Sequence, residues 1–156
     1  MKIKKAQLED TQEIFLLVQN TIRTVYSNAY TKDEVEFFST LHNIEAIKED
    51  VSKGIVFVLS DVNKILATAT VEGNHLMRVF VEQFHRGQGF GSKLMDFVES
   101  EIAKNYKESV LDTSLVAKDF YTHRGYVYTH SDSIEINGGK ILKYDIMKKT
   151  LTEGRI

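Results

Sequence analysis

The sequence contains no cysteine among its 156 residues. A chain without cysteine forms no disulfide, offers no thiolate to a metal ion and has no thiol nucleophile. Acyl transfer through a cysteine-bound intermediate is therefore excluded, and we predict no metal site. Proline is absent as well, but the composition is otherwise that of an ordinary globular protein, with 42% hydrophobic and 27% charged residues.

Long apolar runs are also missing. No stretch approaches the roughly 18 apolar residues that span a bilayer. The basic N-terminal residues are not followed by the apolar core of a signal peptide. We therefore expect a cytoplasmic protein without membrane contact. An excess of positive charge is missing too, because the formal net charge is −2, so nothing favours nucleic acid as a partner.

The length of the chain fits one domain, which would bury roughly two-thirds of its unfolded surface. The sequence has no repeats, linkers or low-complexity segments. We predict a single domain over residues 1–149 and a frayed C-terminal tail over residues 150–156.

The most informative stretch is residues 75–105, which divide into an apolar strand, a turn with three glycines in five positions and an amphipathic helix. Apolar residues recur at helical spacing after the glycines, which places them on one face of the helix. We expect this helix to be half buried, with its N-terminus at the glycines. The apolar face holds Phe90, Leu94, Phe97, Val98 and Ile102, and the opposite face holds Lys93, Asp96, Glu99, Ser100 and Lys104.

A glycine-rich turn at a helix N-terminus is suited to bind an anion. The first helical turn has N–H groups without intrahelical partners and carries the positive end of the macrodipole. Glycine lacks the Cβ atom that would keep a phosphate at a distance, and Arg86 adds a full charge. An alternative interpretation is a tight strand-to-helix connection in which the glycines only supply unusual dihedral angles.

The common nucleotide-binding motifs do not match this turn. A P-loop is absent, and Gly87, Gly89 and Gly91 are spaced G-x-G-x-G, whereas the dinucleotide fingerprint is G-x-G-x-x-G. A nicotinamide-nucleotide protein stays open as a remote alternative, because Asp112 follows Gly91 by 21 residues, about where a ribose-binding acid is expected. Only 44 residues follow Asp112, which is too few for the second half of such a fold.

Two motifs resemble those of the Gcn5-related N-acetyltransferase (GNAT) superfamily. The first, Arg86-x-x-Gly89-x-Gly91, matches the Q/R-x-x-G-x-G/A signature of the pyrophosphate-binding turn. The second is Ala117-x-x-x-Tyr121-x-x-x-Gly125-Tyr126, which is similar to the A-x-x-x-Y-x-x-x-G-F/Y helix of that family. The two motifs together are specific, although they cover only residues 75–126.

The resemblance implies an α/β (mixed α+β) fold. Its centre would be a mixed, mainly antiparallel sheet of about seven strands, splayed between strands 4 and 5 and flanked by about four helices. The other sequence patterns predict strands and helices in the same order as in this fold. We expect a short strand at residues 2–6, helices near residues 10–22, 31–41 and 44–51, and a hairpin over residues 55–71. After the Tyr121 helix, residues 126–136 and 141–148 should form a second hairpin around Asn137-Gly138-Gly139.

The function implied by the resemblance is transfer of an acetyl group from acetyl coenzyme A directly to a primary amine. The pyrophosphate would be bound by the main chain of residues 87–92, assisted by Arg86, and the pantetheine arm by the edge of the central strand. Ser114 stands where many members carry an asparagine, which weakens that contact. The implied cofactor-binding residues are Val79, Phe80, Val81, Arg86, Gly87, Gln88, Gly89, Phe90, Gly91, Ser92, Ser114, Ala117, Lys118 and Tyr121.

Catalysis would require a donor for the leaving thiolate and a base for the amine. By resemblance the donor is Tyr121, as thiolate stabiliser or general acid; since phenol and thiol pKa values are about 10 and 8.5, a hydrogen bond is favoured over full proton transfer. Family members often place an acid near the start of the central strand. Here His75 and Glu72 occupy that region, and either is a candidate general base.

The acceptor is not named by the sequence. Arg23 suggests a carboxylate on the acceptor, Glu135 suggests a cation, and Tyr26 and Tyr30 could form an aromatic wall. We expect a small-molecule amine or amino-acid-like acceptor rather than a protein, and the resemblance is compatible with a homodimer. A non-catalytic acyl coenzyme A binding or sensing module on the same fold is the main alternative.

Overall fold

The computed structural model of the protein describes residues 1–82 and 87–152. Over these residues the chain forms one seven-stranded sheet in the order β1-β2-β3-β4-β5-β7-β6. Every neighbouring pair is antiparallel except β4 and β5, which are parallel. The mixed, mainly antiparallel sheet predicted from the sequence is thereby confirmed. The strands are β1 (Lys2–Lys5), β2 (Val56–Asp61), β3 (Lys64–Glu72), β4 (His75–Val81), β5 (Glu108–Thr113), β6 (Val127–Ile136) and β7 (Lys140–Thr150).

The described residues also form five α-helices. The helix predicted after residue 43 is separate from the helix that precedes it. Thr31 precedes α2 and forms a capping box, since its Oγ1 accepts from the Glu34 N–H while the Glu34 carboxylate accepts from the Thr31 N–H. The Asn43 side chain caps α3 by accepting from the Ala46 N–H. The helices are α1 (Thr11–Thr24), α2 (Lys32–Leu41), α3 (Ile44–Ser52), α4 (Phe90–Ala103) and α5 (Lys118–His123).

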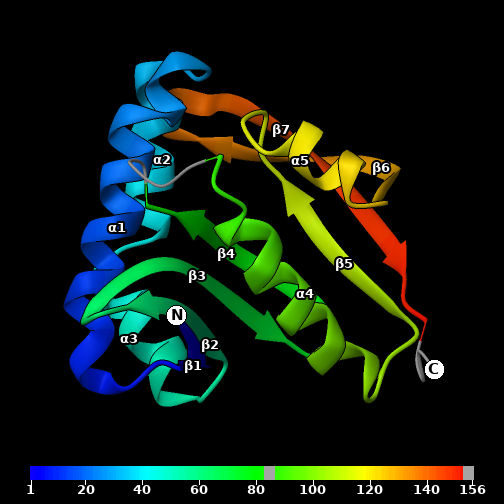
Figure 1. Ribbon diagram of the computed structural model, residues 1–156. Helices are drawn as coiled ribbons and strands as arrows, with labels where there is room; N and C mark the ends of the chain where they lie inside the picture. The colour runs from blue at the N-terminus through cyan, green and yellow to red at the C-terminus, as the bar shows by residue number, and fades with distance from the viewer. Residues whose placement is uncertain (83–86, 153–156) are drawn as a thin grey trace.

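The sheet has a hydrophobic core on each face. Strand β2 alternates between them: Val56 and Val58 pack with α1 and α3, whereas Phe57 and Leu59 pack with α4. Figure 1 shows α4 in front of the sheet, with α1 and α3 gathered at the other side. Both faces of β2 are therefore buried, which explains its continuous apolar run.

Strands β4 and β5 pair only at their beginning. The register joins His75 to Val110 and Leu76 to Leu111, and no later pair connects the two strands. Beyond this point the strands diverge, as Figure 1 shows for the green and yellow-green arrows. The expected splay between strands 4 and 5 is confirmed, and it opens the centre of the sheet.

A β-bulge in β4 coincides with the splay. The register with β3 shifts between Thr68 and Thr70, and Arg78 adopts a φ of 50°. Leu76 and Phe80 would share one face of a regular strand, yet Leu76 packs in the α4 core and Phe80 in the α1 core. The extra residue thus reverses which face the later side chains occupy.

Two sequence expectations need correction. Glu99 was placed on the polar face of its helix, but it is only 8% exposed. Its carboxylate accepts from Arg124 and Lys149 and lies 3.0 Å from the Tyr126 hydroxyl. At the C-terminus, the strand continues through Thr150, and Leu151 is buried with its N–H donating to the Lys107 carbonyl. The predicted boundary at residue 149 therefore falls within β7.

Candidate active site between strands β4 and β5

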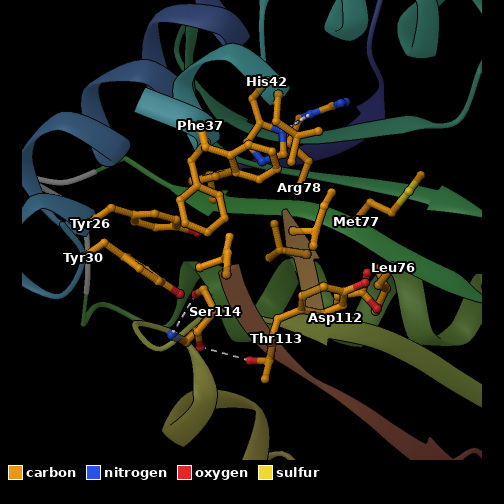
Figure 2. Close-up of a pocket in the computed structure, with 18 of the residues that line it drawn as sticks. Tyr26, Tyr30, Phe37, His42, Leu76, Met77, Arg78, Asp112, Thr113 and Ser114 are labelled. Atoms are coloured by element: carbon orange, nitrogen blue, oxygen red, sulfur yellow. Dashed lines mark hydrogen bonds between the residues drawn. The ribbon is translucent and has the colours of Figure 1, made fainter. Parts of the chain in front are cut away.

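The splay between β4 and β5 holds a cleft of about 420 Å³. Figure 2 shows Tyr26, Tyr30 and Phe37 on one side of it and Thr113 and Ser114 on the other. One wall thus comes from the chain around α2, and the other from the end of β5 and the loop that leads to α5. The volume is at the small end of the range for small-molecule sites.

The glycine turn precedes α4. Gly87 and Gly89 have φ of 82° and 81°, and a Cβ atom added to either would meet nothing within 4 Å among residues 1–82 and 87–152. The main chain here is thus open to a close approach by a ligand. Gly91 has a different role, since its Cβ would lie 3.1 Å from Val81 Cγ2, so it lets α4 pack closely on β4. Phe90, Gly91 and Ser92 form the first helical turn, Gln88 lies between the first two glycines, and Arg86 lies outside the described residues.

The later part of β4 offers an open main-chain edge. Val79, Phe80 and Val81 follow the bulge, and their β5-facing side pairs with no strand in the described part of the chain. Val79 and Phe80 line the cleft, whereas the Phe80 ring is buried against α1. An amide-containing ligand could therefore pair with backbone groups here, as the sequence analysis expected of the pantetheine arm.

Tyr121 projects from α5 into the cleft while being only 6% exposed. Its ring packs against Phe120 and Tyr126, with centroids 5.3 and 5.6 Å away. Burial raises the pKa of the Tyr121 phenol above its usual 10. The hydroxyl therefore stays protonated at neutral pH and can donate a hydrogen bond, and full proton transfer to a thiolate is less favourable than it is for an isolated phenol.

The loop from β5 to α5 is fixed by short hydrogen bonds. Ser114 Oγ accepts from the Ala117 N–H at 3.2 Å, and both residues line the cleft. Tyr30 reaches across from the α1–α2 connection, where its hydroxyl accepts from the Leu115 N–H at 2.7 Å. Lys118 instead donates to Asp145 on β7 at 2.8 Å. Ser114 is therefore placed beside the cleft, but its hydroxyl already accepts from the Ala117 N–H just before α5.

His75 and Asp112 form a pair at the base of the splay. His75 Nε2 lies 3.6 Å from Asp112 Oδ1, and both residues line the cleft. The Asp112 carboxylate raises the pKa of the His75 imidazole above its usual 6.5, against the opposing effect of partial burial. Of the two candidate bases, the structure brings His75 to the cleft and leaves Glu72 exposed outside its lining. From the sequence, Asp112 was expected only as a ribose ligand, and its pairing with His75 was not predicted.

The sheet does not have the topology that the nicotinamide-nucleotide alternative requires. A doubly wound nucleotide-binding fold requires a largely parallel sheet, whereas only β4 and β5 run parallel in the part of the chain that is described. Asp112 faces the cleft with His75 instead.

Only some of the predicted acceptor-binding residues line the cleft. Tyr26 and Tyr30 line the cleft, but Arg23 and Glu135 do not. Arg23 donates to the Asn20 side chain on its own helix. Several apolar lining residues were not predicted from the sequence, although an aromatic pair on one helix was a visible signal. They are Phe37, Phe38, Leu41, Ile134 and Leu142.

A buried ion pair lies in the cleft wall. The Arg78 guanidinium donates to Asp50 at 2.7 Å and to His42 Nδ1 at 3.0 Å. Burial and the nearby Arg78 charge lower the pKa of His42 to about 3. His42 is therefore neutral and serves as an acceptor for Arg78, whose own charge is compensated by Asp50.

No group of three or more His, Asp or Glu side chains within residues 1–82 and 87–152 is arranged to hold a metal ion. Over the same residues, no helix has both the length and the apolar character needed to cross a membrane.

Comparison with known proteins gives a family and a fold. Residues 26–149 match the family model described as acetyltransferase (GNAT) domain. A GCN5-related N-acetyltransferase from Rhodopseudomonas palustris superposes with a TM-score of 0.88 at 20% identity, covering 96% of this chain and 95% of the other. The PaiA N-acetyltransferase from Thermoplasma acidophilum, in complex with coenzyme A, gives 0.75 at 15% identity over 96% and 98%. An N-acetyltransferase from Staphylococcus aureus Mu50 gives 0.72 at 19% identity over 96% of both chains. No curated protein matches the sequence.

Proposed function

Because the chain belongs to the GNAT acetyltransferase family, we propose that it moves an acetyl group from acetyl coenzyme A to the primary amine of a small molecule. The observation that carries this proposal is the convergence of three features on one cleft. These are the buried phenol of Tyr121, the open edge of β4 at Val79 and the imidazole of His75.

The residues present fit coenzyme A. The open main chain at Gly87 and Gly89 suits a pyrophosphate, because glycine permits a close approach and α4 adds a helix N-terminus. The unpaired edge of β4 suits the amides of the pantetheine arm. Bound acetyl coenzyme A would supply an activated acyl group as a thioester. A relative of the same fold is known in complex with coenzyme A.

Tyr121 and His75 would have separate roles in the reaction. After the acceptor nitrogen bonds to the acyl carbon, the C–S bond of the thioester breaks, and Tyr121 would donate a hydrogen bond to the sulfur atom as negative charge develops on it. His75 would accept a proton from the acceptor, since an alkylammonium of pKa about 10 is neutral in only about one molecule in a thousand at pH 7. Asp112 would hold the imidazole and stabilise its protonated form.

The proposal is tested by amine-dependent thiol release from acetyl coenzyme A, together with thermal shift against acetyl coenzyme A, coenzyme A and NAD. We expect the coenzyme A species to raise the melting temperature and a subset of primary amines to give thiol release. Stabilisation by acetyl coenzyme A without turnover for any amine would instead favour the non-catalytic binding module.

The pH profile should report the His75–Asp112 pair. Because Asp112 raises the His75 pKa, kcat/KM should rise with pH through a value above 6.5. The substitution Asp112→Asn removes the carboxylate that raises the His75 pKa, so the rise of kcat/KM should move to lower pH. The measurement is kcat/KM between about pH 5.5 and 9 with one acceptor. Ionisation of the acceptor affects the wild-type protein and the variant equally. If kcat/KM rises over the same pH range in both, His75 is excluded as the base.

Replacing Gly89→Val should weaken coenzyme A binding by about tenfold or more, because a side chain at φ 81° strains the turn and obstructs the main-chain donors. Gly54→Val is a matched control, since Gly54 lies after α3 and also has a positive φ, 73°, and no described atom lies within 4 Å of its added Cβ. Calorimetric titration with coenzyme A measures both. Equal affinity of the two variants would contradict the assignment of the turn.

A further inference from the structure

The half of the cleft nearest α2 is lined by aromatic rings in mutual contact. Tyr26 lies 5.2 Å from Phe38 and 5.9 Å from Phe80 between ring centroids, and Tyr30 lies 4.9 Å from Phe38. Phe37 continues the cluster at 5.7 Å from Phe38. Figure 2 shows Tyr26, Tyr30 and Phe37 on this side of the cleft. A rigid aromatic wall favours an apolar or aromatic body in the bound molecule.

The opposite wall of this half is apolar as well. Ile134 and Leu142 of the β6–β7 hairpin line the cleft, and an ion pair between Asp33 of α2 and Lys140 of β7 joins the hairpin to α2. Leu41 and Ile134 remain 49% and 42% exposed although both are large apolar residues of the lining. An apolar ligand would remove this surface from water.

Charged groups in this half are few, and Arg78 is already compensated. The Arg78 guanidinium is 11% exposed and is bound by Asp50, and neither Arg23 nor Glu135 belongs to the lining. The lining has an acidic group at Asp112, beside His75, at the base of the splay. Lys143, an exposed member of the lining, would repel a second ammonium group.

We propose that the acceptor is a small primary monoamine whose body is an aromatic ring or a compact hydrocarbon. Its ammonium group would lie toward His75 and Asp112, and its body against the aromatic wall. This inference rests on the proposed function, because it concerns the acceptor half of the same cleft. A cleft of about 420 Å³ that also receives the acyl end of the cosubstrate excludes a bulky acceptor.

The test uses pairs of amines that differ by one charged group. The first pair is 2-phenylethylamine and phenylalanine, which adds a carboxylate; the second is pentylamine and 1,5-diaminopentane, which adds an ammonium group. We expect kcat/KM for thiol release to be at least about tenfold higher for the monoamine of each pair. The carboxylate of phenylalanine lies one carbon from the amine and would face the Asp112 carboxylate, and the second ammonium group of the diamine would face Lys143.

A variant should reverse the second preference. In Leu41→Glu, a carboxylate stands at the mouth of the acceptor half, so kcat/KM for 2-phenylethylamine should fall, chiefly through KM, while that for 1,5-diaminopentane should rise. Leu16→Glu is the matched control, because Leu16 is 51% exposed on α1 and lies outside the lining. We expect the control to leave both values unchanged.

The outcomes separate this inference from the proposed function. Faster acetylation of phenylalanine, the diamine or a lysine-containing peptide would overturn the inference and leave acetyl transfer intact. An unchanged preference in Leu41→Glu would also overturn it. If no amine supports thiol release although acetyl coenzyme A raises the melting temperature, the proposed function fails, and this inference with it.

Discussion

Replacing Tyr121→Phe should lower kcat by roughly 10²- to 10³-fold, the loss typical of removing one donor to a developing negative charge. The phenylalanine ring retains the packing against Phe120 and Tyr126, so the fold and the affinity for acetyl coenzyme A should be preserved. Steady-state thiol release measures kcat, and thermal shift with acetyl coenzyme A measures binding.

The matched control is Tyr128→Phe. Tyr128 is exposed on β6, contacts Ser131 through its hydroxyl and lies outside the cleft lining, so kcat should not change. The raised pKa of Tyr121 gives a second expectation. Because burial raises this pKa above 10, ionisation of the phenol should cause no fall in kcat below pH 10. A Tyr121→Phe enzyme with wild-type kcat would reduce Tyr121 to a packing residue.

Replacing Glu99→Gln should lower the free energy of unfolding by about 3 kcal/mol, because removing one partner leaves buried charges uncompensated. Glu99 accepts from Arg124 and Lys149, both 2.9 Å away, and is almost fully buried. For a domain of this size the melting temperature should fall by roughly 6–12 °C. Glutamine has nearly the same shape, so the loss reports the charge rather than a cavity.

Glu101→Gln on the same helix is the control. Glu101 pairs with Lys104, whose side chain is 65% exposed, and an exposed pair of this kind contributes at most about 1 kcal/mol. Chemical denaturation of both variants gives the comparison. Equal losses would mean that the buried network adds no more than a surface ion pair.

The Glu99 network also connects the two motifs of the site. Arg124 follows α5 and reaches Asp96 and Glu99 on α4, and it lies 3.4 Å from the Ser92 carbonyl in the first turn of that helix. It therefore holds the helix that carries Tyr121 against the helix that begins at the glycine turn. Side-chain hydrogen bonds thus join two elements that β5 separates in the sequence.

The sequence by itself determined the local elements and their order. The capping box at Thr31 and Glu34 depends on four consecutive residues, and the apolar face of α4 depends on helical spacing alone. The open turn at Gly87 and Gly89 likewise follows from residue type, because glycine favours a positive φ. Patterns of this kind are complete within one segment of the chain.

The tertiary structure alone decided how these elements meet. The bulge at Arg78 places Phe80 on the face opposite to Leu76, and strict alternation in the sequence cannot reveal an added residue. The pairing of His75 with Asp112 and the burial of Glu99 beside Lys149 join residues 37 and 50 positions apart. Such contacts depend on strand register and packing across the whole sheet, so no local pattern encodes them.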